Sequence, residues 1–117
     1  MNRFLNSFRF AWNGLVVAFR EQLNLKIHAV MAVLVFVAGF YFNITIVEWC
    51  IITGISVLVI SLELINTAIE NLVDLVTMER KPLAGKIKDI AAGAVLIASI
   101  GSVVVGIIIF YKYIFEI

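Results

Sequence analysis

The chain has 117 residues, of which 63% are hydrophobic, and its mean hydropathy is +1.10. This composition excludes a soluble globular enzyme and predicts an integral membrane protein with a single domain, residues 1–117. The formal net charge of +1 gives no indication of a nucleic-acid partner. The only cysteine, Cys50, excludes an internal disulfide.

The first predicted element is an amphipathic helix over about residues 3–22. Aromatic and aliphatic side chains recur at helical spacing on one face of this segment, and the arginines lie mostly on the rest of the helix. Such a helix suits the cytoplasmic surface of a membrane. From the residues alone it is either a plain interfacial anchor or also the cover of a functional site. The apolar face consists of Phe4, Phe8, Trp12, Leu15, Val16 and Phe19.

The positions of the charged residues predict three membrane spans. Residues 27–47 and 90–111 carry no charge, and about 20 apolar residues cross a bilayer. Only about 21 Å of uncharged helix separates Glu48 from Glu63, so a middle span must place one of these glutamates at its edge or inside. We therefore expect an all-α protein with spans at about 27–47, 48–76 and 88–113. Glu48, in the first link between spans, is expected to be solvated.

The basic residues predict the orientation of the spans. Arginines and lysines precede the first span and fill the loop at 76–89, whereas the link at 43–48 has none. By the positive-inside rule, the N-terminus and this loop face the cytoplasm. Within the loop, Pro82 is expected to open a helical turn and Gly85 to end one.

A row of small residues marks the third span. Ala94, Ala98, Ser102 and Gly106 recur every four residues, so they share one face of a helix. Small residues at this spacing let another helix backbone come close. The row therefore predicts helix packing rather than chemistry.

The most unusual stretch is ELINTAIENLVDL, residues 63–75. At about 100° per residue its polar side chains fall on one side of a helix and its aliphatic side chains on the other. An ionisable residue at the centre of a membrane helix costs about 2.5–3.5 kcal/mol on insertion scales, and such residues face a protein interior or a wet cavity. We therefore interpret this polar stripe as a functional site. The stripe consists of Glu63, Asn66, Thr67, Glu70 and Asp74.

The polar stripe and the loop after it suit phosphoryl transfer. Carboxylates one to two turns apart offer oxygen ligands for Mg²⁺ and a separate group that can take a proton. Lys86 and Lys88 add cations that can hold phosphate oxygens near the membrane surface. Positioning and charge neutralisation supply most of the catalysis in this reaction. Gly85 and Lys86 are followed by Ile87, so the sequence has no Walker loop and any nucleotide site is unconventional.

The pattern E-x-x-N-[ST]-x-x-E-x-x-x-D at 63–74, followed by ERKPLAGKIKDIAAGAVLIASI, resembles the bacterial integral-membrane diacylglycerol kinase family, which includes the undecaprenol kinases. The resemblance runs from AWNGL through the third span. It implies a surface helix and three transmembrane helices in the bacterial cytoplasmic membrane, assembled as a homotrimer with active sites between subunits. It also implies Mg²⁺-dependent transfer of the ATP γ-phosphate to a lipid alcohol. Diacylglycerol and undecaprenol both stay open as the acceptor.

The resemblance further implies roles for individual residues. Glu63 would be the general base that deprotonates the lipid hydroxyl, Asn66 would help to orient that hydroxyl, and Trp12 would contact the lipid. Glu70 would ligate the metal that bridges the phosphates, Lys88 would contact the phosphates, and Asp89 would contact the ribose. The implied ATP-binding residues are Arg3, Phe10, Glu70, Glu79, Arg80, Lys81, Lys88 and Asp89.

One departure from the family pattern concerns the metal site. The family has a second metal-binding glutamate in a stretch like E-x-N-x-x-I-H, and REQLNLKIH aligns with it through Asn24, Ile27 and His28. This alignment puts Gln22 where the acid belongs. A neutral amide is a poorer ligand for a hard cation, so either Glu21 reaches the metal or the metal is held less tightly. His28 itself is expected to be an interfacial hydrogen-bonding residue rather than a catalyst.

Two other functions remain open from the sequence. A small proton-coupled transporter would use Glu63 as its membrane carboxylate, although the loop cations would then lack a purpose. A catalytically impaired family member acting as a membrane assembly factor would explain Gln22.

Overall fold

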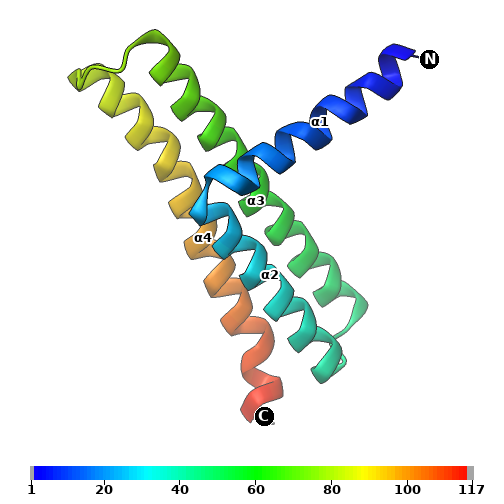
Figure 1. Ribbon diagram of the computed structural model, residues 1–117. Coiled ribbons are helices and arrows are strands. Elements are labelled where there is room, and N and C mark those ends of the chain that lie inside the picture. The colour runs from blue at the N-terminus through cyan, green and yellow to red at the C-terminus, as the bar shows by residue number, and fades with distance from the viewer. Residues whose placement is uncertain (1, 116–117) are drawn as a thin grey trace.

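The computed structural model describes residues 2–115, which form four helices (Figure 1). They are α1 (Asn2–Glu21), α2 (Leu23–Phe42), α3 (Ile46–Val76) and α4 (Pro82–Phe115). By length and composition, α2, α3 and α4 are each able to cross a membrane. The predicted all-α fold, with an N-terminal helix followed by three possible spans, is confirmed.

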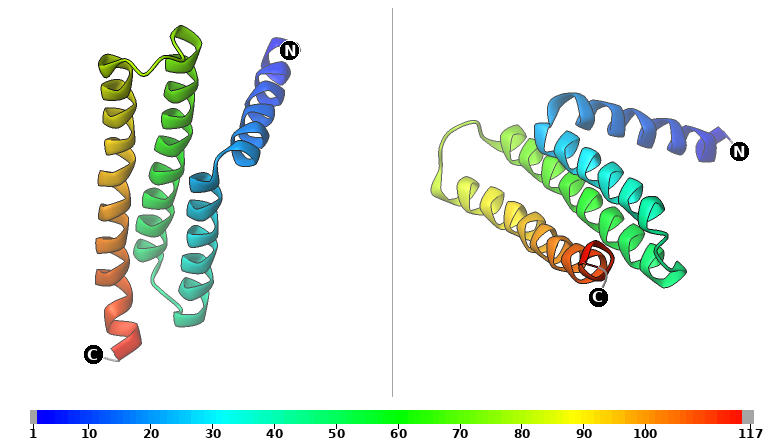
Figure 2. Two further views of the ribbon diagram at one scale, coloured as in Figure 1. Left: turned by 60° about the vertical axis from the view of Figure 1, so that its left-hand side comes forward. Right: turned by 90° about the horizontal axis from the view of Figure 1, so that it is seen from below.

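The three long helices share one packing centre, which is α3. α3 packs against both α2 and α4, whereas α2 and α4 make few contacts with each other within residues 2–115. Figure 2 shows α2, α3 and α4 side by side, with α1 directed away from them. The chain changes direction at Gln22, whose extended backbone (φ −112°, ψ 112°) separates α1 from α2. This break lets α1 run in a different direction from α2.

The turn between α2 and α3 depends on two capping arrangements. α2 ends at Phe42, before the expected limit of the first span, because Asn43 adopts a left-handed conformation (φ 51°, ψ 54°) that asparagine tolerates. At the start of α3, the Thr45 hydroxyl accepts a hydrogen bond from the Glu48 N–H (3.2 Å). The Glu48 carboxylate in turn accepts one from the Thr45 N–H (3.0 Å). This capping box fixes the first residue of α3 at Ile46.

The expectation that Glu48 is solvated is wrong, because this residue is only 8% exposed. The Lys112 ammonium lies 2.8 Å from one carboxylate oxygen, and the Tyr113 hydroxyl donates to the other at 2.5 Å. Both donors come from the end of α4, which reaches the start of α3 because the two helices run antiparallel along their whole length. Glu48 therefore ties α3 to α4 at the end of the bundle opposite the 77–81 loop.

Gly39 on α2 lets Trp49 of α3 approach the α2 backbone. A Cβ at position 39 would lie 2.7 Å from Cη2 of Trp49 and 3.1 Å from Cδ1 of Ile44. Trp49 also meets the ring of Phe36 edge to face, with centroids 5.6 Å apart. The glycine is thus required by space, since its backbone is ordinary helix.

We expect Gly39→Ala to lower the thermal unfolding midpoint of the detergent-solubilised protein. Overpacking of a well-packed contact costs about 1–3 kcal/mol, and the Trp49 ring has to move to admit the methyl group. Gly54→Ala on α3 is the matched control, because its added Cβ meets nothing within 4 Å. An equal fall in the midpoint for both variants would contradict the packing explanation.

The loop at 77–81 leads directly into α4. Pro82 is the first residue of α4, as predicted, and it suits this position because the first helical turn does not use its N–H. Gly85 does not end a turn, contrary to the prediction, because it lies inside α4. α4 therefore begins before the expected limit of the third span, and Lys86 and Lys88 stand on its first turns.

Candidate active site

The polar stripe of α3 faces the inside of the protein. Glu63 is 2% exposed, Thr67 5% and Asn66 8%, whereas Ile65 and Leu72 on other sides of the same helix are more than half exposed. The periodicity of the sequence explains this division, since residues three and four apart share a face. The carboxylate of Glu63 is thereby held inside an apolar span and away from lipid.

Hydrogen bonds within the stripe leave one polar atom free. Thr67 donates its hydroxyl proton to the backbone carbonyl of Glu63 (2.9 Å), so it does not occupy the carboxylate. The Asn66 amide nitrogen donates to Glu70 at 3.4 Å. The Asn66 carbonyl oxygen Oδ1 is buried and has no hydrogen-bond partner among the residues that the structure describes. A buried acceptor without a donor costs about 1–3 kcal/mol, so this atom is poised to accept a hydrogen bond from a ligand.

His28 at the start of α2 faces Glu63. Its Nε2 atom lies 3.6 Å from Oε2 of Glu63, which is too long for a hydrogen bond but within the range of an ionic contact. The histidine side chain is 23% exposed, so it stands between the buried carboxylate and the exterior. Sequence reasoning gave His28 only an interfacial role and missed this contact, because the packing of α2 on α3 is not encoded in local spacing. The position of His28 at the start of the first predicted span was the sequence signal that could have indicated this contact.

Asp74 and Lys88 join the cytoplasmic ends proposed for α3 and α4. The Lys88 ammonium lies 2.6 Å from a carboxylate oxygen of Asp74, and both side chains are partly exposed. Asp74 therefore anchors the lysine that the resemblance assigns to phosphate binding. The pair places one cation beside the end of the stripe that lies near the 77–81 loop.

The other residues implied for nucleotide binding lie on two separate parts of the chain. Arg3 and Phe10 are exposed on α1, and Figures 1 and 2 show the N-terminal end of α1 pointing away from the 77–81 loop. In that loop, Lys81 lies 3.9 Å from Glu79, and both side chains are exposed. A single chain therefore does not bring these two groups together. The exposed residues in these parts are Arg3, Phe10, Trp12, Glu79, Arg80, Lys81 and Asp89.

The oxygen donors implied for the metal do not form a closed site in one chain. No group of three His, Cys, Asp or Glu side chains within residues 2–115 could hold a metal ion. Glu70 is partly buried in the stripe, Glu21 is exposed at the end of α1, and Gln22 is partly buried in the break after it. Mg²⁺ is commonly bound by one or two carboxylates together with substrate phosphates. The donors present fit an ion that arrives with a nucleotide.

Comparisons with known proteins agree with this chemistry. Residues 9–110 match the sequence profile of the family described as prokaryotic diacylglycerol kinase. The chain is 43% identical over 110 residues to the undecaprenol kinase of Bacillus subtilis, which covers 94% of this chain and 89% of that protein.

Two proteins named diacylglycerol kinase are also similar. The one from Synechocystis sp. is 44% identical over 103 residues, covering 87% of this chain and 59% of that longer protein. The one from Escherichia coli (strain K12) is 27% identical over 111 residues, covering 95% of this chain and 91% of that protein.

Proposed function

Since the chain belongs to the prokaryotic diacylglycerol kinase family and is a lipid kinase, we propose that it transfers the γ-phosphate of ATP to the hydroxyl of diacylglycerol or undecaprenol, with Glu63 as the base. The observation that carries the proposal is a buried carboxylate next to an unpaired acceptor inside an apolar span. A lipid alcohol dissolved in the membrane supplies one hydroxyl proton, which can first satisfy the acceptor as a hydrogen bond and then pass to the carboxylate.

Residues of the stripe and of the neighbouring helices have separate roles in this proposal. On binding, the incoming hydroxyl donates its single proton in a hydrogen bond to the Asn66 carbonyl. It then turns this proton toward Glu63, which takes it as the oxygen attacks phosphorus. Burial of Glu63 keeps water away from the attacking group, so transfer to water is disfavoured. His28, at 3.6 Å from Glu63, holds the carboxylate on the side where α2 meets α3. Trp12 on α1 contacts the lipid at the membrane surface.

The nucleotide lies on the cytoplasmic side of Glu63 in this proposal. Glu70 would hold Mg²⁺, with Glu21 or Gln22 as the second protein ligand, and the ion would neutralise charge on the phosphate oxygens when bound. Lys88, anchored by Asp74, adds a cation at the same level. Asp89 would receive the ribose, and Arg3, Phe10, Glu79, Arg80 and Lys81 complete the ATP site.

The assembly is proposed to be a homotrimer with sites between subunits. The separation of Arg3 from the 77–81 loop supports this, because a neighbouring subunit is needed to bring the two halves of the nucleotide site together. The many exposed aliphatic side chains of α2, α3 and α4 suit contact with lipid and with other subunits. The positive-inside rule supports a cytoplasmic N-terminus and active site in the bacterial membrane.

Purified protein, incubated with labelled ATP, Mg²⁺ and lipid alcohol in mixed micelles, is expected to give labelled lipid. Undecaprenol and diacylglycerol are compared side by side at equal mole fraction, which decides between the two acceptors. A protein that labels neither lipid would contradict the proposed function. Solute-dependent proton flux in liposomes without ATP would instead favour a transporter.

A further inference from the structure

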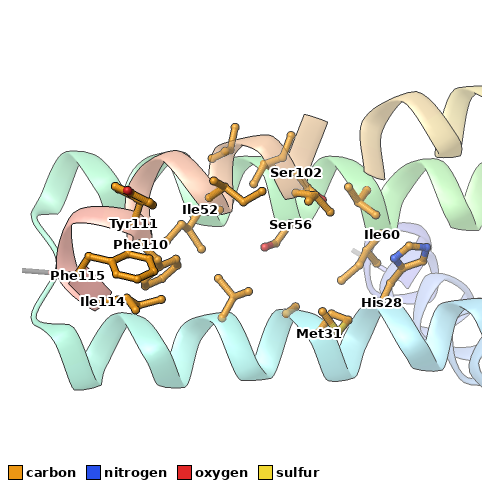
Figure 3. Close-up of a pocket in the computed structure, with 18 residues that line it drawn as sticks. His28, Met31, Ile52, Ser56, Ile60, Ser102, Phe110, Tyr111, Ile114 and Phe115 are labelled. Carbon is orange, nitrogen blue, oxygen red and sulfur yellow. The ribbon is translucent and has the colours of Figure 1, made fainter. Parts of the chain in front are cut away.

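A long apolar groove starts next to the candidate active site and runs away from it through the bundle (Figure 3). α3 forms its floor, while α2 and α4 form its two walls, because these two helices pack on α3 but scarcely on each other. The groove has a volume of about 450 Å³. His28 stands at one end of it and Phe110 and Phe115 stand at the other.

The groove begins beside Glu63, where the proposed function places the lipid hydroxyl. His28 lines the groove and also lies 3.6 Å from the Glu63 carboxylate. On the floor, Ile60 is the lining residue nearest to Glu63, less than one helical turn away along α3. A molecule whose hydroxyl reaches Glu63 therefore has the mouth of the groove beside it.

The length of the groove distinguishes between kinds of lipid chain. Its floor reaches Ile52, about 16 Å beyond Glu63 along the helix axis, and the α4 wall continues to Phe115. A hydrocarbon core is about 30 Å thick, so a groove that begins near the inner boundary passes the middle of the membrane. The acyl chains of a lipid in the inner leaflet end near that middle, whereas a long prenyl chain extends further.

The lining suits a hydrocarbon tail. It is mostly aliphatic and aromatic, and its polar groups are His28 at one end and the hydroxyls of Ser56, Ser102 and Tyr111. Of these, the Ser102 hydroxyl is turned back to the carbonyl of Ser99 at 2.7 Å. The groove stays open on the α4 side because of Gly106, where an added Cβ would meet nothing within 4 Å. Ser102 and Gly106, which belong to the row of small residues predicted to let another helix come close, also line this groove.

We propose that this groove binds the tail of a long prenyl alcohol whose hydroxyl is phosphorylated at Glu63, so that the groove between α2 and α4 selects acceptors by chain length. The inference rests on the proposed kinase function and narrows its acceptor to the polyprenol class. Gly106 is then a specificity-determining residue for the tail rather than a catalytic one.

The test fills the groove and varies the length of the acceptor. Gly106→Leu is assayed with undecaprenol and with dimethylallyl alcohol, which has the same allylic alcohol but only one isoprene unit and so has little tail to place in the groove. We expect kcat/KM for undecaprenol to fall by about tenfold or more, in line with changes in a hydrophobic specificity pocket, while the value for dimethylallyl alcohol stays near that of the parent. Gly101→Leu is the matched control on the same helix, because position 101 has equal space but lies outside the groove lining. It is expected to change neither value.

Ala32→Leu is a second variant that fills the groove, in this case from the α2 wall. It provides the same test if Gly106→Leu does not fold. Turnover of dimethylallyl alcohol reports in each variant that the protein is folded. An equal loss with both acceptors, or no loss with undecaprenol, would overturn the proposal. A change in oligomeric mass on Gly106→Leu would also overturn it, since a neighbouring subunit would then be the occupant. A parent that phosphorylates diacylglycerol but neither prenol would overturn the proposal alone, whereas a parent that phosphorylates none of the three alcohols would reject the kinase function itself.

Discussion

Replacing Glu63 by glutamine is expected to lower the turnover of lipid phosphorylation by about 10²–10⁴-fold, the usual contribution of a general base. Glutamine keeps the shape of the side chain but cannot take the proton of the lipid hydroxyl. Because Glu63 is only 2% exposed, replacing its charge by a neutral amide removes a desolvation cost. The partly exposed His28 loses only a contact at 3.6 Å, so the variant should unfold at the same temperature or a higher one. The measurements are initial rates at saturating ATP and lipid, and a thermal unfolding curve.

Glu48→Gln provides the matched control for this prediction. It makes the same change in a buried glutamate of the same helix, at the end that contacts Lys112 and Tyr113. We expect it to lower stability, because the ammonium of Lys112 loses its partner, and to leave turnover per folded molecule near the parent value. Glu63→Gln with more than about a tenth of the parent rate would mean that another group takes the proton.

The helices were predictable because their signals are local. Charge-free stretches marked the spans, and the spacing of Glu63, Asn66 and Glu70 placed them on one face before any packing was known. Pro82 marked the start of α4 for the same reason, since its chemistry alone suits a first helical turn. Each of these features depends on residues within a few positions of one another.

Except for Gly85, which lies inside α4 instead of ending a turn, the failures involve partners distant in sequence. Glu48 was predicted to be solvated because its partners Lys112 and Tyr113 are distant in sequence. Tyr113 lies 65 residues from Glu48, and only the antiparallel packing of α3 and α4 brings them together. The contact of His28 with Glu63 likewise depends on how α2 packs against α3. The groove was beyond prediction because it results from the sparse packing of α2 against α4, which meet where Phe42 contacts Phe110 and Tyr113. Only an assembled bundle defines these features.

A second large effect is expected for the metal site. Glu70→Gln should lower kcat/KM by about 10²–10³-fold, the loss typical of one charge-stabilising group, and raise the Mg²⁺ concentration needed for half-maximal rate. A neutral amide is a poor ligand for a hard cation, and Glu70 is a partly buried carboxylate of the stripe that accepts a hydrogen bond from Asn66 at 3.4 Å. Binding of Mn²⁺ in the presence of ATP, followed by electron paramagnetic resonance, measures the same site without turnover.

Gln22→Glu is expected to act in the opposite direction to Glu70→Gln. It adds a carboxylate in the break between α1 and α2, so the half-maximal Mg²⁺ concentration should fall, by about tenfold if the new oxygen reaches the ion. Glu21→Gln decides the remaining alternative, because it raises this concentration only where Glu21 is already the second ligand. Unchanged Mg²⁺ dependence in Glu70→Gln would show that the metal is held elsewhere, whereas a rise in Glu70→Gln and in Glu21→Gln together would give this kinase a two-carboxylate site despite the glutamine at position 22.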